Sequence, residues 1–327
     1  MQPGEPYPAA TDPSGAPPTA VPPRRNCAAH EVDHRLRRTL PEYATAQDAL
    51  ERRTRARRTA AVAREGCTRI TVVVHVVHRT EEENLSTEQV VSQIDVLNHD
   101  FRATNPDREG TPEPFKPLVA DARISFELAT TDPDGNPTEG ITRTASDRDS
   151  FSSETEDVKS SGSGGADPWP PDRYLNIWTC GDLVSAAGDG LLGYAQFPGG
   201  PAETDGVVIL HSAFGTTGTV TAPFDLGRTT THEVGHWLNL RHIWGDDGTG
   251  CSGSDLVEDT PNCAGPNYGA PTFPSVTCDN GPDGDLFVNY MDYTDDAGMF
   301  MFTPGQVERM DAALDGPRAS LGTTVGC

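Results

Sequence analysis

The chain has 327 residues, seven of them cysteine, and its formal net charge is −24 at pH 7. Residues 1–66 carry 11 Arg and 8 acidic residues, whereas residues 67–327 carry 14 basic and 41 acidic residues. This asymmetry favours a basic arm that lies on an acidic body, and a solvated arm is the alternative. Because the body is acidic and no apolar run is long enough to cross a bilayer, we expect neither nucleic acid nor a membrane as a partner.

Three cysteines, Cys251, Cys263 and Cys278, lie close together in a stretch rich in Gly, Pro and Asp. Such crowding is typical of a secreted protein stabilised by disulfides, and without a C-x-x-C pair a cysteine zinc finger is not expected. The first residues have no apolar core, so we do not expect them to be a signal peptide. We therefore expect a secreted protein whose signal peptide is absent from this sequence.

The N-terminal third begins with residues 1–23, which are rich in Pro, Ala and Gly and are predicted to be disordered. Residues 30–64 have helical composition and contain two Arg pairs, 52–53 and 57–58. These pairs fit either a site of trypsin-like cleavage or an exposed helix surface. The β-branched run 68–78 predicts a strand, and Ser86 with Gln89 predicts a capping box that starts a helix reaching about Phe101.

The rest of the chain mixes strands and helices without strict alternation. Strands are predicted at 123–129, 174–179 and 206–211, and loops at 145–172 and 244–286. Thr303, Pro304 and Gln306 predict the start of a capped helix that Gly316 can end. The pattern predicts an α+β (mixed α/β) fold with a mixed sheet flanked by long helices.

Residues 232–242 read HEVGHWLNLRH and carry the strongest functional signal. His232 and His236 are four residues apart, so a helix places them on one face, where both can bind one metal ion. Glu233 can reach a water on that metal, and His242 lies beyond the helix if the chain turns after Asn239. Three histidines with an open fourth position predict a catalytic zinc site, and a chance match is the alternative.

Asn239 stands where the extended zinc-protease signature has Gly. The chain must turn sharply there with a positive φ, and Asn tolerates that conformation better than other non-glycine residues. Downstream, Met291 followed by Tyr293 resembles a Met-turn, which lies beneath the zinc in metzincins. Tyr293 is then a candidate hydrogen-bond donor to the oxyanion of the reaction.

Five segments resemble the pappalysin family of metzincin metalloproteases, and most closely its bacterial, ulilysin-like members. They are LLGYAQFPGG (191–200), DGVVILHSAFGT (205–216), GRTTTHEVGHWLNLRHIWGD (227–246), DLVEDTPN (255–262) and NYMDYTDDAGMFMFTPGQVERM (289–310). The resemblance implies a partly helical pro-segment at 1–66 and a metzincin domain at 67–327 with a mixed twisted sheet, an active-site helix and a Met-turn. Its upper subdomain would span about 67–239 and its lower subdomain about 240–327.

The resemblance also assigns roles to single residues. It makes His232, His236 and His242 the zinc ligands and Glu233 the general base. Met291 becomes the Met-turn residue and Tyr293 the switch tyrosine. The strand at 206–211 would lie near the upper edge of the cleft, where substrate backbone pairs.

Cys27 matches approximately the position at which the family's pro-segment places a Cys on zinc. A thiolate there would fill the open fourth position and keep the zymogen inactive. The alternative is that Cys27 is a disulfide partner or has no function. The resemblance further implies a disulfide between Cys251 and Cys278, whereas the pairing of Cys67, Cys180, Cys263 and Cys327 stays open.

The family binds calcium in the same loop, and its oxygen ligands here would come from Asp255, Glu258, Asp259 and Thr260, with Asp255 and Thr260 foremost. A solvated acidic loop is the alternative. Asp295 and Asp296 follow the Met-turn, where metzincins build the pocket for the residue after the scissile bond. Carboxylates there would favour Arg or Lys in that position, whereas two solvent-facing Asp would not.

These features predict a zymogen of a secreted zinc endopeptidase that acts on proteins or peptides and is inhibited by its own pro-segment. Two alternatives remain at this point. One is an HExxH enzyme with a Glu as third ligand, for which Glu258 lies at a suitable spacing. The other is a catalytically silent zinc-binding protein on a protease scaffold.

Overall fold

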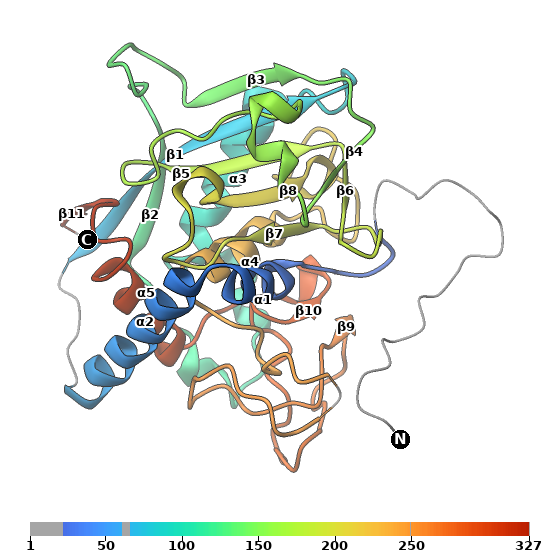
Figure 1. Ribbon diagram of the computed structural model, residues 1–327. Coiled ribbons are helices and arrows are strands. Elements are labelled where there is room, and N and C mark those ends of the chain that lie inside the picture. Colours follow the sequence, from blue (N-terminus) through green and yellow to red (C-terminus); the bar gives the residue numbers. More distant parts are fainter. Residues whose placement is uncertain (1–21, 61–65, 249, 327) are drawn as a thin grey trace.

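The computed structural model describes residues 22–60, 66–248 and 250–326. A twisted sheet fills the upper half of the molecule, and long loops of the C-terminal part lie below it (Figure 1). Two N-terminal helices cross the front between these halves. Most of the predicted disordered segment, residues 1–21, lies outside the described residues.

The sheet is built around one long strand, β1 (Cys67–His78), whose valines are fully buried. On one side β1 pairs first with β2 (Ile124–Leu128) and then with β3 (Ile141–Ala145), and on the other side with β5 (Leu175–Cys180). β8 (Val207–Leu210) and then β7 (Gly193–Ala195) extend the sheet beyond β5. β7 and β11 (Thr323–Val325) are antiparallel to their neighbours, so the sheet is mixed, as predicted.

The sheet order corrects one expectation about the cleft. Residues 206–211 do not form the edge, because β8 lies between β5 and β7. The edge strand is β7, only three residues long, and no strand was predicted there. Its sequence, Gly-Tyr-Ala, is too short for a period-two signal.

The helices mostly follow the sequence patterns. α3 (Thr87–Asp100) starts at Ser86, whose side chain accepts a hydrogen bond from the backbone N–H of Gln89, but the Gln89 side chain donates elsewhere, to Phe214 O. α5 (Pro304–Leu314) has the full capping box at Thr303. The helical composition of 30–64 resolves into α1 (Ala29–Thr39) and α2 (Pro41–Ala60), because a proline disfavours helical geometry in the residue before it.

Short elements complete the chain. Two pairs of short strands are β4 (Ser150–Ser152) with β6 (Asp182–Val184) and β9 (Tyr268–Gly269) with β10 (Tyr293–Thr294). The 3₁₀ helices are Pro106–Gly110, Lys116–Leu118, Asp157–Lys159, Ser161–Ser163, Ala202–Thr204, His211–Ala213 and Asp296–Gly298. In the described part of the chain, no helix is long and apolar enough to span a bilayer.

The helix that carries the zinc motif, α4 (Arg228–Trp237), is buried along its whole length. It contacts β7 and β8 on one side and α3 on the other. The buried carboxylate of Asp100 on α3 pairs with Arg228 and accepts a hydrogen bond of 2.6 Å from the Thr231 hydroxyl. Charge-assisted bonds of this kind fix the helix in register next to the sheet edge.

Candidate active site

Three histidines converge below the edge of the sheet. Each ring is held by its Nδ1 atom: His232 donates to Tyr290 O (2.7 Å), His236 to Leu240 O (2.8 Å) and His242 to Asp246 Oδ1 (2.6 Å). With Nδ1 carrying the proton, the Nε2 atom of each ring keeps a free lone pair. The three Nε2 atoms lie 3.1–3.2 Å from one another, which brings three lone pairs together.

This arrangement suits a zinc ion. A cation stabilises lone pairs that face one another without a hydrogen-bond donor between them. Nitrogen ligands about 2.0–2.1 Å from a tetrahedral zinc are separated from one another by distances similar to those between the three Nε2 atoms. Burial, with the neighbouring imidazoles next, lowers the pKa of His232 and of His236 well below the usual range. The rings are therefore neutral, the form that binds metal.

The turn between the second and third histidine has the predicted form. Asn239 has a φ of 76°. Its N–H donates to His236 O (2.9 Å), and the N–H of Leu240 donates to Gly235 O (2.9 Å). These two bonds form a Schellman motif, which ends α4 at once and returns the chain toward the metal site.

Met291 lies beneath the histidines and is fully buried. A Cβ on Gly235 would come within 2.5 Å of the Met291 sulfur, so any larger residue inside the zinc motif would force the buried Met291 side chain to shift. The residue before Met291, Tyr290, supplies the carbonyl that holds His232. The predicted Met-turn therefore supports the site by packing and by one hydrogen bond.

Glu233 points into the same space from α4 and is 1% exposed. Burial raises the pKa of Glu233 to about 8, although the hydrogen bond from Cys27 and the charge of Arg25 act in the opposite direction. A Cβ on Gly193 of β7 would lie 2.9 Å from Glu233 Cγ. The edge strand thus leaves room for this carboxylate only because its residue 193 has no side chain.

Cys27 reaches the histidines from the N-terminal segment. Its Sγ atom and the three histidine nitrogens all lie within 4.8 Å of one another, and the thiol donates to Glu233 Oε2 at 3.3 Å. Its backbone N–H donates to the Tyr293 hydroxyl (3.1 Å), which in turn donates to Cys27 O (3.2 Å). Cys27 is a free cysteine, so the alternative that it is a disulfide partner is wrong.

The backbone around Cys27 runs along β7 like an added strand. Asn26 O accepts a hydrogen bond from Leu192 N (3.0 Å), and Ala28 N donates to Gly193 O (3.3 Å). The bridge between Cys27 and Gly193 is parallel. The N-terminal segment therefore fills the groove between the edge strand and the histidines.

Arg25 is inserted into a closed pocket beside the site. Its Nη2 donates to Asp296 Oδ1 (2.5 Å), its Nη1 to the Thr229 hydroxyl (3.0 Å) and its Nε to Thr294 O (3.1 Å). Asp296 is fully buried, which contradicts a solvent-facing role for this residue, whereas Asp295 is partly exposed. Of the two candidate pocket residues, it is Asp296 that binds a guanidinium.

The long C-terminal loop has the disulfide Cys251–Cys278 that the resemblance implied. Cys67 is also disulfide-bonded, whereas Cys180 and Cys263 are free. In the same loop, Thr260 donates to Asp255 Oδ2 (2.7 Å) and Val257 N donates to Asp255 Oδ1 (3.1 Å).

Glu258 is not a third zinc ligand. Its side chain is 77% exposed and pairs with Arg58 (3.0 Å) on α2. Asp259 is used by α5, because it accepts hydrogen bonds from Thr303 (2.6 Å) and from Gly305 N (2.8 Å). His242 stands where the third ligand is needed, which rejects the alternative of an enzyme that uses Glu.

Comparisons with known proteins agree with this geometry. The sequence profile of the peptidase family described as pregnancy-associated plasma protein-A matches residues 160–315. An extracellular metalloprotease of Arthroderma benhamiae is 31% identical over 247 residues, 74% of this chain and 70% of the relative. The chain belongs to the pappalysin family. Its membership confirms the sequence-based assignment to this family and the metalloprotease class.

Other similar proteins match the chain over different lengths. An extracellular metalloprotease of Pyricularia oryzae is 39% identical, but the match spans only 48% of that relative. The structure of mature mirolysin of Tannerella forsythia with a cleaved peptide is 50% identical, with a TM-score of 0.76, and covers 79% of this chain and 97% of that one. A promirolysin mutant from the same organism is 46% identical, with a TM-score of 0.82, and covers 91% and 97%. These matches confirm the metzincin-type mixed fold.

Some contacts of the site were not predicted. Asp246, which holds His242, lies four residues after that histidine, and an acidic residue so close to a metal ligand is a usable signal. The insertion of Arg25 into the Asp296 pocket left no local signal, because the two residues are 271 positions apart.

Proposed function

We propose that the chain is the zymogen of a secreted zinc endopeptidase. Residues 1–66 form its pro-segment and residues 67–327 its catalytic domain, which consists of an upper and a lower subdomain that meet near residue 239. The observation that carries the proposal is the convergence of three imidazoles beside Glu233, with the Cys27 thiol next to them. The extracellular relatives support secretion. The higher coverage by promirolysin than by the mature form supports a pro-segment.

His232, His236 and His242 would hold the zinc through their Nε2 atoms. Zinc bound in this way supplies a Lewis acid that polarises a peptide carbonyl and lowers the pKa of water to about 7. Glu233 Oε2 would accept the proton of the attacking water and pass it to the leaving amide nitrogen. With the N-terminal segment in place, burial raises the pKa of Glu233 to about 8, and a general base works best when its pKa lies near the working pH.

Tyr293 binds the pro-segment in the zymogen and would stabilise the oxyanion in the proposed reaction. Its hydroxyl now donates to Cys27 O and accepts from Cys27 N. Once the pro-segment has left, the same hydroxyl can donate to the oxyanion that develops on the substrate carbonyl. The pro-segment thus inhibits in two ways, since it occupies Tyr293 and places the Cys27 sulfur where substrate would react.

The Asp296 pocket supports a preference for Arg or Lys beside the scissile bond. A guanidinium already fills it with three hydrogen bonds, and the carboxylate is also held by Leu226 N (2.8 Å) and Arg228 N (3.2 Å). Such a fixed acceptor at the end of a closed pocket selects a long cationic side chain. Asp295, at the rim, would add only a screened charge.

Calcium is the second metal in the proposal. The buried carboxylate of Asp255, whose pKa is raised to about 7 by burial, would gain from a nearby cation, and the Thr260 hydroxyl beside it is a suitable hard ligand. Calcium that binds here would stabilise the loop closed by Cys251 and Cys278. A rise in melting temperature on adding calcium to chelator-treated protein, lost in Asp255→Asn, would support this site.

The proposal is tested by Glu233→Gln in protein freed of its pro-segment. We expect one zinc per chain in both proteins and a loss of peptide hydrolysis of at least ~100-fold in the variant. Glu258→Gln, at an exposed position, is the matched control and keeps full activity. Near-normal turnover in Glu233→Gln would reject the mechanism, and zinc binding without turnover in the wild type would favour the silent binding protein.

A further inference from the structure

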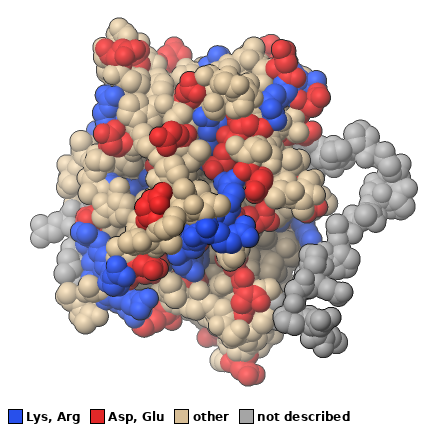
Figure 2. Space-filling view, in the orientation of Figure 1, with Lys and Arg blue, Asp and Glu red and all other residues tan. Residues whose placement is uncertain are grey.

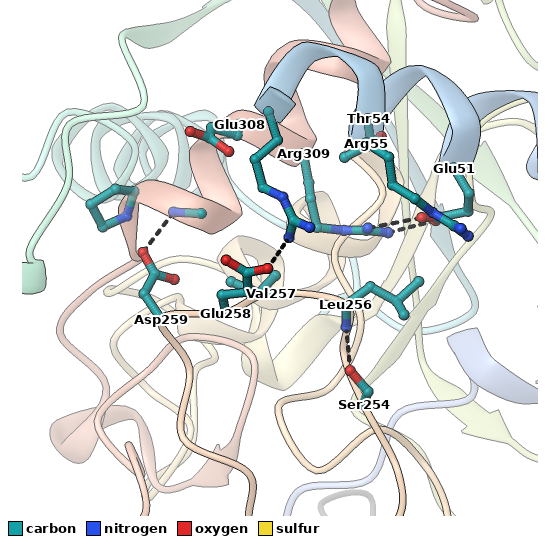
Figure 3. Close-up of a pocket in the computed structure, with 13 residues that line it drawn as sticks. Glu51, Thr54, Arg55, Ser254, Leu256, Val257, Glu258, Asp259, Glu308 and Arg309 are labelled. Carbon is teal, nitrogen blue, oxygen red and sulfur yellow. Dashed lines mark hydrogen bonds and ion pairs between the residues drawn. The ribbon is translucent and has the colours of Figure 1, made fainter. Parts of the chain in front are cut away.

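A buried ion pair joins the second half of α2 to the catalytic domain. Glu51 accepts two hydrogen bonds from Arg309 of α5, Nη2 to Oε1 at 2.7 Å and Nη1 to Oε2 at 3.0 Å. Figure 3 shows the two side chains facing each other from their helices. Only 10% of the Glu51 side chain and 2% of the Arg309 side chain are exposed, so both charges have left water.

The same pair touches the zinc motif. Arg309 Nε donates to Asn239 O (3.1 Å), and the Asn239 amide lies 3.4 Å from Glu51 Oε1. The N-terminal segment is therefore attached to the turn after α4 as well as to the cleft. This attachment involves other residues than that of Cys27, which is bound to Glu233 and Tyr293.

Further charges extend the contact along α2. Arg57 pairs with Asp311 (3.6 Å) and with Asp315, and Arg58 pairs with Glu258 (3.0 Å). Basic side chains gather over α2 in Figure 2. Among the α2 side chains that form these ion pairs, one acid (Glu51) is followed by two bases (Arg57 and Arg58), and the catalytic domain offers one base and three acids to them. The two surfaces are complementary in charge.

Apolar packing contributes little to this part of the contact. From Glu51 to the end of α2, the buried residues are Glu51 and Thr54, both polar. Beside the ion pair a cavity of about 460 Å³ opens between α2 and the loop at 254–259. The second half of α2 is thus held by charge. Salt screens the exposed pair Arg58–Glu258 more than the buried pair Glu51–Arg309, and it weakens the attraction between the two charged surfaces.

We propose that α5 and residues 254–259 form a docking surface, which consists of acidic residues around Arg309. This surface retains the N-terminal segment after the chain is cut between α2 and β1. The occupant is the segment's own helix α2, whose Glu51 pairs with Arg309. The inference rests on the proposed zymogen. It adds that cleavage and release are separate steps, and that release is favoured by salt.

The experiment uses the full chain with Glu233→Gln and with residues 61–65, which lie outside the described residues, replaced by the recognition sequence of a site-specific protease. After cutting, size-exclusion chromatography measures how much N-terminal fragment stays bound at about 0.05 M and about 1 M salt. Because nothing here measures turnover, the result is independent of the peptidase assay. A failed proposed function and a failed docking surface are therefore told apart.

We expect the fragment to co-elute at low salt and its dissociation constant to rise at least ~tenfold at high salt. Glu51→Gln should raise the constant at least ~tenfold at low salt, because it leaves the Arg309 charge buried without a partner. Glu42→Gln, an exposed residue on the same helix, is the matched control and should change nothing.

Cys27→Ala separates this surface from the cleft. In that variant the effect of Glu51→Gln should persist. Two results would overturn the proposal: loss of the wild-type fragment at low salt immediately after cutting, or equal retention by Glu51→Gln and Glu42→Gln. If Glu51→Gln prevents folding of the chain, the salt series on the wild type decides, and retention that does not change with salt contradicts the proposal.

Discussion

The guanidinium of Arg25 and the carboxylate of Asp296 form a hydrogen-bonded ion pair of 2.5 Å in a pocket closed to solvent, with exposed fractions of 1% and 0%. Arg25 precedes Cys27 by two residues, so one short segment fills both the pocket and the space above the histidines. The Arg25 guanidinium of the pro-segment is therefore itself an example of the cationic group that the Asp296 pocket binds.

Asp296→Asn should therefore change substrate preference. Removing the charge leaves a cationic side chain in the closed pocket without a partner, at a cost of a few kcal/mol. We expect kcat/KM for peptides with Arg after the scissile bond to fall ~100-fold relative to peptides with Leu there. Cleavage of a peptide library by the mature protein measures this ratio.

Asp295→Asn is the matched control, because Asp295 lies next in sequence but is partly exposed. Its effect should stay below about tenfold, since solvent and salt screen an exposed charge. A wild-type enzyme with no preference for Arg or Lys would reject the role of Asp296.

Cys27→Ala should reduce latency. Without the sulfur the segment loses its contact with the metal site, but keeps Arg25 in its pocket. We expect hydrolysis by the uncut chain to rise at least ~tenfold, equivalent to ~1.4 kcal/mol or more of lost inhibition. An assay with a small peptide and gel analysis of the same sample would show whether activity precedes processing. A variant as latent as the wild type contradicts the switch.

Asp246→Asn should weaken metal binding. The Asp246 carboxylate accepts the Nδ1 proton of His242 and so fixes the orientation of that ring. Loss of such a partner lowers metal affinity by ~10–100-fold. Competition with a chromophoric chelator measures the change, and an unaltered zinc affinity would show that the ring is held by packing alone.

Asn239→Ala should destabilise the protein and Asn239→Gly should not. An alanine held at positive φ costs ~1–2 kcal/mol, whereas glycine adopts it freely. For a catalytic domain of this size we expect the melting temperature to fall by ~2–6 °C in the alanine variant. Calorimetry on both variants compares them directly, and equal melting temperatures would mean that the turn relaxes.

His75 should make the fold sensitive to acid. It lies inside the sheet, where its ring contacts Thr142 (2.8 Å) and Asn176 (2.9 Å). Burial lowers its pKa from 6.5 to about 4, so the folded protein binds fewer protons than the unfolded chain between these values. Its contribution, about 3 kcal/mol, is present above pH 6.5 and is lost as the pH falls toward 4.

Urea unfolding of the wild type and of His75→Gln at pH 7 and about pH 4.5 tests this contribution. The difference in unfolding free energy between the two pH values should shrink in the variant. Loss of metal at low pH affects both proteins alike and cancels in the comparison. An identical pH dependence would assign the acid sensitivity to other groups.

The sequence predicted the parts of the site that depend on local spacing. The helical repeat brings His232 and His236 together, and the tolerance of Asn for positive φ correctly places the turn at residue 239. Capping residues predicted the starts of α3 and α5 for the same reason, because caps act within four residues. These signals need no knowledge of the tertiary fold.

Contacts between distant segments could not be predicted in this way. Residues 206–211 were predicted to lie near the upper edge of the cleft and to pair with substrate, whereas the sheet edge is formed by residues 193–195, because strand order depends on pairing across the whole domain. The pairs Arg25–Asp296 and Glu51–Arg309 join residues more than 250 positions apart. Composition indicated only that the charge of the basic N-terminal arm is complementary to that of the acidic body.

The pairing of residues 26–28 with β7 has a consequence for how the protein can be stored. An open sheet edge is a template for strands of other molecules, and short edge strands limit but do not remove that risk. In the zymogen, hydrogen bonds to Leu192 and Gly193 are already made within the chain. Self-association through this edge at high concentration should therefore begin only after activation, which makes the uncut chain the safer form for accumulation.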